Sequence, residues 1–414
     1  MSDPRDVVFV TIDSIRADHC SWWGYERETT PTLDRLADEG LVFETAIAPA
    51  SETFGSVTTF LADGDSNKRP VSRHPTIGDR IREHMTARDT VAERFSREGY
   101  ETAGFSTNPW TSRFFGFDAG FDHYEDFMET DESVQRGQGG GRSLGISTLL
   151  EQARHWRNGQ GMYMSWEAIY DDVIDHQRTM ESPYFLWTFL VDPHMPYIPG
   201  EGHRSQPSAL TYLSNLWLYA GSDRFESRFH DWLITAYDDA IEHTDAFLER
   251  LVDEVGEGPD APLVVIVGDH GEEFGEHGHY GHGGRLYEEL IHVPLVIANG
   301  PDDVVSEPFS LRRMPELLSR LAHGEGYDDL TDPYVVSGNN APKVAVRGGE
   351  WKYIWSPDRE ELYGIDGVGP EHRVLENDDL LEVGRDVTAG YHEAEAEIER
   401  VLSGVDEAVA TGRL

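Results

Sequence analysis

One stretch of the chain, residues 263–297, carries residue types that bind metal ions or anions. An aspartate and four histidines stand there among glycines, between two apolar runs. They are Asp269, His270, His277, His279 and His282. Imidazole nitrogen and carboxylate oxygen are ligands for divalent metals, and the glycines allow the chain to turn closely around an ion. This density favours a metal or phosphate/sulfate site over a surface loop whose polar groups are only solvated.

The element that positions this group is a buried strand. Leu263–Val267 is a β-branched apolar run that stops at Gly268, which is typical of a parallel strand covered on both faces. In open α/β sheets, sites are built at the carboxyl ends of the strands. The pattern therefore predicts that Asp269 and His270 lie at this edge of a sheet.

Two other apolar runs end in the same way. Val7–Ile12 is followed by Asp13, and residues 184–191 are followed by Asp192 and His194. If the first strand neighbours the one that ends at Gly268, Asp13 and Asp269 face the same crevice. For Asp13 taken alone, capping of the following turn is the simpler interpretation.

A hydroxyl-rich turn leads into a predicted helix near residue 53. Ser51, Thr53 and Ser56 stand at its start. A helix N-terminus offers free N–H groups and the positive end of its dipole to an anion or a developing alkoxide. The alternative is ordinary helix capping by these hydroxyl groups.

The remaining pattern predicts two parts, a main α/β unit over 1–334 and a small α+β subdomain over 335–414. Residues 62–85 are predicted to be irregular, and a Gly-rich insertion at about 128–160 is predicted as a lid or a disordered segment. Further helices are predicted at 31–40, 90–98, 225–255, 311–323 and 391–402, and further strands at 42–46, 100–106, 344–347, 351–354 and 361–363.

The chain is strongly acidic. It has 77 Asp and Glu against 34 Lys and Arg among 414 residues, a formal charge of −43. Such self-repulsion destabilises a compact state in ordinary buffer, but at molar salt the screening length falls to about 3 Å. We therefore expect a halophilic protein of a salt-rich cytoplasm, as in a halophilic archaeon, with a merely acidic mesophilic protein as the alternative. The charge also opposes binding to nucleic acid or to anionic membranes.

Cysteine content and hydropathy set further limits. Cys20 is the single cysteine, so the chain forms no intrachain disulfide and no cysteine metal cluster. No run approaches 18 apolar residues, and the first residues lack a basic start followed by an apolar core. We expect a cytoplasmic protein without stable membrane insertion; the sequence leaves its oligomeric state open.

Several segments, in order along nearly the whole chain, carry a family resemblance. They are VTIDSIRADHCSWWGY, TTPTLDRLADEGLVFETAIAPAS, GYETAGFSTNPW, FLVDPHMPY, VGDHGEEFGEHGHYGH with LYEELIHVPLVI, and RGGEWKYI with EELY. With these segments the chain resembles the sulfatase family of the alkaline phosphatase superfamily. The resemblance implies a doubly wound, mostly parallel α/β sheet and a small C-terminal antiparallel sheet.

The resemblance also implies a divalent metal site. Carried over, its ligands are Asp13, Asp269, His270 and the nucleophile, Thr53. Ser14 stands where many sulfatases have a second acid, which removes a ligand charge. Because His270 also replaces a common Asn, the site looks less like an all-oxygen calcium site, and Mn or Zn becomes as plausible as Ca or Mg. One ion is expected. Two metals are the alternative, with the second site built from Asp192, His194 and His282.

The nucleophile segment departs from the family pattern. Sulfatases carry Cys or Ser in a C/S-x-P-S-R motif that is converted to formylglycine, whereas the corresponding stretch here is Thr53–Val57. Threonine cannot become formylglycine. Superfamily members with an unmodified threonine are mainly phosphodiesterases and phosphoalcohol transferases, which favours phosphoesters. Ser51 and Ser56 stay open as alternative nucleophiles.

The resemblance suggests a role for each remaining site residue. Thr53 would attack a phosphate or sulfate ester, and His194 or His282 would protonate the leaving alcohol. Asn108, Asp192 and Arg16 are the substrate-binding candidates, with a structural role as the preferred alternative for Arg16. The substrate would be a small-molecule, glycan or lipid-headgroup ester. The alternatives are a true sulfuric ester hydrolase and a catalytically degenerate metal-binding protein.

Overall fold

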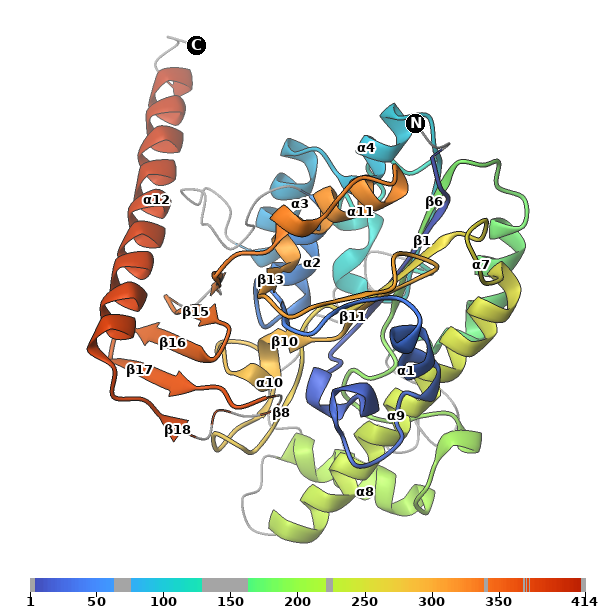
Figure 1. Ribbon diagram of the computed structural model, residues 1–414, viewed down its shortest axis with the longest axis horizontal. Coiled ribbons are helices and arrows are strands. Elements are labelled where there is room, and N and C mark those ends of the chain that lie inside the picture. The colour runs from blue at the N-terminus through green and yellow to red at the C-terminus, as the bar shows by residue number, and fades with distance from the viewer. Residues whose placement is uncertain are drawn as a thin grey trace.

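The protein is built around an eight-stranded sheet with helices on both faces (Figure 1). The computed structural model describes residues 4–62, 76–128, 163–220, 226–338, 342–367, 369, 371 and 373–410. Across the sheet the strands are β12 (Asp303–Val305), β2 (Leu41–Phe43), β11 (Leu295–Ala298), β7 (Leu263–Gly268), β1 (Val7–Ile12), β6 (Tyr184–Leu190), β4 (Glu101–Ser106) and β5 (His123–Glu125). Only β11 runs antiparallel to its neighbours within this sheet. The predicted doubly wound, mostly parallel fold is confirmed.

Two apolar layers, one on each face of the sheet, make up the main core. Along β1 the side chains alternate, so that Val7 and Phe9 join one layer and Val8 and Val10 the other. The first layer is covered by α2 (Thr53–Leu61), α3 (Ile77–Ala87), α4 (Val91–Arg97) and α11 (Met314–Ala322). The second is covered by α1 (Pro31–Asp38), α7 (Tyr170–Gln177) and α9 (Glu226–Val255), with α8 (Ser208–Ala220) packed on α9.

A smaller antiparallel sheet follows at the C-terminal end. Its strands are β14 (Tyr334–Gly338), β15 (Val344–Gly348), β16 (Trp351–Ser356), β17 (Arg359–Gly364) and β18 (Arg373–Val374). The long helix α12 (Asp378–Ala410) packs on β15 and β16, with Gly384 against the ring of Tyr353, and extends past the sheet (Figure 1). An added Cβ at Gly384 would lie 2.4 Å from that ring, so this close packing requires glycine.

Short elements join the two sheets near the predicted site. They are β3 (Ala46–Ile47), β8 (Glu273–Phe274), β9 (Tyr280–Gly281), α10 (Glu288–Ile291), β10 (His292–Val293) and β13 (Phe309–Ser310). Among the helices of the described ranges, none is both long and apolar enough to cross a membrane. The insertion predicted at about 128–160 lies outside the described residues, apart from Met128.

The prediction of an irregular segment at 62–85 is wrong for its second half, which forms most of α3. Thr76 caps this helix by accepting a hydrogen bond from the N–H of Asp79, and Ile81 and Met85 share its buried face. Two apolar residues four positions apart, among many charges, gave too weak a periodic signal. The closing helix α12 also begins earlier than predicted.

Thr90→Ala should lower the free energy of unfolding by about 1–2 kcal/mol. Thr90 Oγ accepts from the N–H of Glu93, whose carboxylate accepts from the N–H of Thr90, and the hydroxyl also donates to the carbonyl of Ala119. Urea unfolding at high salt measures the change. Thr86→Ala, at an exposed position on α3, is the control and should cost less than about 0.5 kcal/mol. Equal losses of unfolding free energy in the two variants would show that the cap of α4 does not stabilise the protein more than an exposed threonine does.

Candidate active site

The site begins where β1 and β7 end side by side. The two strands pair in parallel with Ile12 opposite Gly268, so Asp13 and Asp269 follow at the same level of the sheet. Both side chains are fully buried. Ser14 has a φ of 59°, a sharp turn that brings its N–H to within 3.0 Å of Asp269 Oδ1. The turn therefore fixes the two carboxylates relative to each other.

Asp13 is oriented by two side-chain donors. The hydroxyl of Ser14 donates to Oδ1 at 2.8 Å, and the amide of Asn108 donates to Oδ2 at 2.7 Å. Asn108 follows β4, which is separated from β1 by β6, so this contact depends on the sheet order. The residue expected to bind substrate is thus in contact with Asp13 and helps to position it.

Asp269 presents an unsatisfied oxygen. Its Oδ1 accepts hydrogen bonds from the N–H groups of Ser14 and His270, whereas the buried Oδ2 has no hydrogen-bond partner in the part of the chain that the structure describes. Burial, and then the charge of Asp13, raise the pKa of Asp269 well above its usual value. Two adjacent buried carboxylates are costly without a positive partner. The donor set therefore fits a bound cation.

His270 completes a three-residue cluster. Its Nδ1–H donates to the carbonyl of Gly271 at 2.8 Å, which assigns the lone pair to Nε2. Nε2 lies 3.7 Å from Asp13 Oδ1 and 3.6 Å from Asp269 Oδ2. Burial and the nearby His282 lower the pKa of His270 to about 4. A neutral imidazole with its lone pair facing two carboxylates is suited to metal ligation.

Thr53 faces this cluster from the first turn of α2. The residue is 4% exposed, and its hydroxyl lies 3.3 Å from His270 Nε2. The alternative nucleophiles make other contacts: Ser56 donates to the carbonyl of Asp269, and Ser51 donates to Glu52. Of the three hydroxyl groups, that of Thr53 lies beside the imidazole of His270.

An imidazole pair lies beside the cluster. The ring of His282 is 4.6 Å from that of His270 and 5.0 Å from that of His194. Glu272 Oε1 lies 3.0 Å from His282 Nδ1; although burial lowers the pKa of His282, this carboxylate raises it to about 9. Sequence reasoning missed Glu272. Its signal was an acid two residues after His270, in a turn that also carries the metal-type residues.

Arg16 is occupied by protein groups. It is 2% exposed, pairs through two nitrogens with Asp18, and also contacts Glu276 and the carbonyl of Glu272. This bonding supports the structural role and leaves the substrate-binding role without support. Arg16 links the end of β1 to the loop after β7.

Asp192 is found in a different group from the one predicted. It accepts from the hydroxyl of Ser165 and the N–H of Trp166, and it lies 3.6 Å from His243 Nδ1. His243 in turn contacts Glu167. Of the alternative second metal set, His194 and His282 lie together, while Asp192 faces His243 and is held by Ser165 and Trp166.

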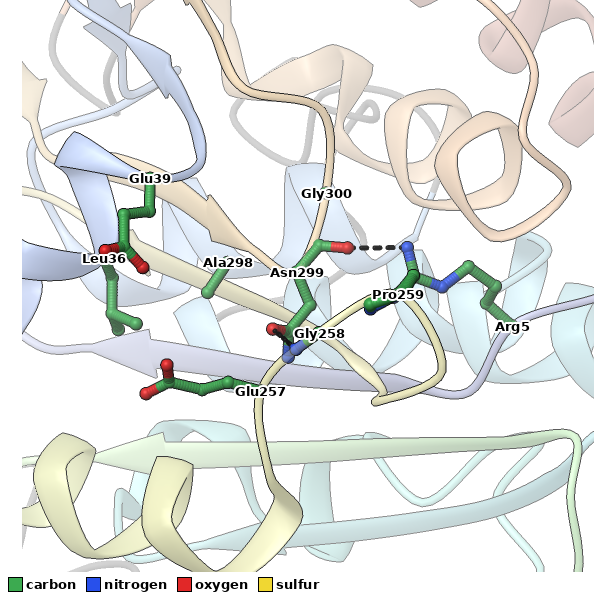
Figure 2. Close-up of a pocket in the computed structure, with 9 residues that line it drawn as sticks. All are labelled: Arg5, Leu36, Glu39, Glu257, Gly258, Pro259, Ala298, Asn299 and Gly300. Atoms are coloured by element: carbon green, nitrogen blue, oxygen red, sulfur yellow. Dashed lines mark hydrogen bonds between the residues drawn. The ribbon is translucent and has the colours of Figure 1, made fainter.

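A cavity of about 540 Å³ lies at the other end of β1, around Arg5, which precedes that strand (Figure 2). The guanidinium of Arg5 donates to the carbonyl groups of Asn299 and Ala261. Glu39 and Glu257 also line the cavity. The metal-type cluster and this cavity are at opposite ends of the strand, so the cavity is not the candidate active site.

The chain is similar to known proteins in both sequence and fold. The sulfatase family model matches residues 5–307. A sulfatase from Formosa agariphila is 22% identical over 87% of this chain and 81% of its own length. Among solved structures, the phosphonate monoester hydrolase of Agrobacterium radiobacter superposes with a TM-score of 0.62 at 16% identity, covering 96% of each chain.

A second solved structure extends the comparison to transferases. The soluble domain of lipooligosaccharide phosphoethanolamine transferase A from Neisseria meningitidis superposes with a TM-score of 0.51 at 18% identity, covering 78% of this chain and 89% of its own. At such identities the superpositions establish a shared fold. The family match over residues 5–307 shows that the chain belongs to the sulfatase family.

Proposed function

We propose that this family member is a metal-dependent hydrolase or transferase of phosphate or sulfate esters, with phosphoesters favoured and Thr53 as the nucleophile. The observation that carries the proposal is the contact of the Thr53 hydroxyl with His270 Nε2, beside two buried carboxylates. A nucleophile, a metal-type cluster and a protonatable imidazole within one buried group are the parts that ester cleavage requires.

Asp13, Asp269, His270 and Thr53 would hold the cation. One imidazole with carboxylate and hydroxyl oxygens suits Mn or Zn as well as Mg or Ca. When bound, such an ion lowers the pKa of a coordinated hydroxyl and polarises an ester oxygen. The unsatisfied Oδ2 of Asp269 supports its binding here.

The residues of the chain would supply the remaining steps. Thr53 would release its hydroxyl proton to solvent when the cation binds and would attack in line as an alkoxide. A bond forms from its oxygen to phosphorus or sulfur as the ester bond to the leaving alcohol breaks. His282, whose Nδ1 faces Glu272, donates a proton from Nε2 to that alcohol. The neutral imidazole then accepts a proton from the water or second alcohol that releases Thr53. His194, beside His282, is the alternative donor.

Phosphoesters are favoured because the formylglycine motif is replaced by Thr53–Val57. Two proteins of similar fold are named for phosphonate monoester hydrolysis and for phosphoethanolamine transfer. A small-molecule, glycan or lipid-headgroup ester is the proposed substrate class.

The acidic composition supports a salt-rich cytoplasm as the location of the protein. Residues 1–334 are proposed as the catalytic unit, and residues 335–414 as a small subdomain.

The test is a paired assay of the metal-stripped full chain at high salt. Mn, Zn, Mg or Ca is returned, and aryl sulfate, aryl phosphate and bis-aryl phosphate are compared as substrates. Phosphodiester turnover restored by Mn or Zn is the expected result. Preferential sulfate release would overturn the phosphoester preference. Tight metal binding without any turnover would support the catalytically degenerate alternative.

His282→Ala should slow esters of poorly acidic alcohols by about 10²–10⁴-fold, because these alcohols must be protonated as they leave. Esters of p-nitrophenol should lose much less, since that leaving group departs as an anion. The measurement is kcat/KM for both ester types. His279→Ala, an exposed histidine of the same loop, is the control. Equal losses for both leaving groups would exclude His282 as the proton donor.

A further inference from the structure

A second group of metal-type side chains lies between the loop after β7 and the C-terminal sheet. His277 comes from that loop, Glu289 from α10, and Glu371 from the segment between β17 and β18. His277 Nε2 lies 3.0 Å from Glu289 Oε1 and 3.5 Å from Glu371 Oε2. The three segments thus place one potential ligand atom each within 4.8 Å of the others.

The ligand atoms of this group are unsatisfied. Glu289 is 1% exposed, and among the described residues neither of its carboxylate oxygens has a hydrogen-bond partner. The same holds for His277 Nε2 and Glu371 Oε2. His277 Nε2 lies at ion-pair distance from Glu289 and Glu371, but among the described residues it makes no hydrogen bond to either carboxylate. Buried polar atoms are normally paired, so this convergence indicates a ligand between them.

The spacing and the surroundings also suit a cation. Ligand atoms about 2.0–2.2 Å from a tetrahedral ion lie about 3.3–3.6 Å apart. The separation of 3.5 Å from His277 Nε2 to Glu371 falls in this range, and the separation of 3.0 Å to Glu289 is somewhat shorter. The His277 ring stacks on Tyr287, with 3.6 Å between centroids. The other oxygen of Glu371 accepts a hydrogen bond from the N–H of Glu288 at 3.0 Å and lies 2.7 Å from Lys352 Nζ in an ion pair. The neighbours thus fix the orientation of the ligands, as they do around metal sites.

The charged side chains connected to His277 carry a net negative charge that two further positive charges would balance. Five carboxylates and three cationic side chains make up the network around His277, giving a net charge of −2. They are Asp18, Glu276, Glu288, Glu289 and Glu371 with Arg16, Arg347 and Lys352. The nearby Glu273 is already paired with Arg285. A divalent cation balances this charge with a neutral His277, whereas a proton on His277 supplies half of it.

We propose that His277, Glu289 and Glu371 form a buried site for a divalent cation of the zinc or manganese class. The site is separate from the cluster of Asp13, Asp269 and His270. The bound cation would connect the C-terminal sheet, through Glu371, to the loop that begins at Asp269, through His277. One histidine and two carboxylates are a ligand set that both ions accept.

Metal counting on the full chain tests the proposal. Metal-stripped protein is dialysed against Zn²⁺, freed of loose ions by gel filtration at high salt, and analysed for zinc per chain. We expect two ions in the wild type, one in Asp269→Asn, one in Glu289→Gln and none in the double variant. Glu273→Gln, a buried acid of the same loop, is the control and should retain two.

Two results would overturn the proposal: no zinc in Asp269→Asn, or as much zinc in Glu289→Gln as in the wild type. His277 would then be one partner of an ion pair. If the Asp13 cluster bound nothing, the wild type and Asp269→Asn would each hold one ion and Glu289→Gln none. Failure of the proposed catalytic site is therefore distinguishable from failure of this one.

A spectroscopic measurement covers the case in which Glu289→Gln does not fold. X-ray absorption of zinc-loaded Asp269→Asn should show histidine nitrogen and carboxylate oxygen at about 2.0–2.2 Å. His277→Gln in the same background should remove the nitrogen contribution. A shell of oxygen alone in Asp269→Asn would contradict the proposal.

Discussion

Thr53→Ala should lower ester turnover by about 10⁴-fold or more, because loss of a nucleophile removes the covalent route. The hydroxyl of Thr53 faces His270 Nε2 at 3.3 Å, and the alternative serines contact Glu52 and the carbonyl of Asp269. Metal binding should be weakened but detectable, since Asp13, Asp269 and His270 are unchanged. Single-turnover kinetics and zinc titration on the same preparation measure both effects.

Two further variants make this test specific. Thr53→Ser keeps a hydroxyl at the same place and should retain part of the activity. Thr59→Ala removes a buried hydroxyl from the same helix, where it donates to the carbonyl of Gly55. It lies six residues along, about 9 Å from Thr53, and should leave turnover near the wild-type rate. Unchanged turnover in Thr53→Ala would remove Thr53 from the mechanism and direct attention to Ser51 or Ser56.

Asp269→Asn should weaken binding of the catalytic cation by more than about 100-fold, because even changes to residues that only orient ligands cost 10–100-fold. Asparagine can keep the two hydrogen bonds that Oδ1 accepts from the N–H groups of Ser14 and His270. The charge on Oδ2, which no donor satisfies, is what the substitution removes. Isothermal titration and turnover with added Zn²⁺ or Mn²⁺ measure the loss.

Thermal unfolding of Asp269→Asn, with and without metal, should distinguish a loss of metal binding from a loss of protein stability. Without metal, the buried charge of Asp269 is repelled by that of Asp13, so the metal-free variant should unfold at a temperature no lower than the metal-free wild type. Metal at about 100 times its dissociation constant should stabilise the wild type by about 2.7 kcal/mol through this site, a gain the variant lacks. Asp245→Asn, at a buried acid that accepts from the N–H groups of Thr32 and Leu33, is the control for metal binding. Equal metal affinity in the wild type and Asp269→Asn would exclude Asp269 as a ligand.

The sequence by itself determined the class of fold and the strand ends that carry the site. Nearly uninterrupted apolar runs such as Val7–Ile12 and Leu263–Val267 indicate strands of a sheet that is buried on both faces, because successive side chains point to opposite faces and nearly all of them are apolar. An acid directly after such a run lies at the carboxyl edge, so Asp13 and Asp269 were identifiable from their positions in the chain. The short amphipathic helix α3 was not, because its few apolar residues are spread among charges.

Tertiary structure alone decided which of these residues meet. Strand order makes β1 and β7 neighbours and brings Asn108 to Asp13 across β6. The start of α2 is placed so that Thr53 faces His270, and Glu272 turns to His282. Periodicity records which face of each element is buried, but it does not record the partner across that face. Those contacts arise only when the layers pack, and they turned Asp192 and Arg16 toward protein groups.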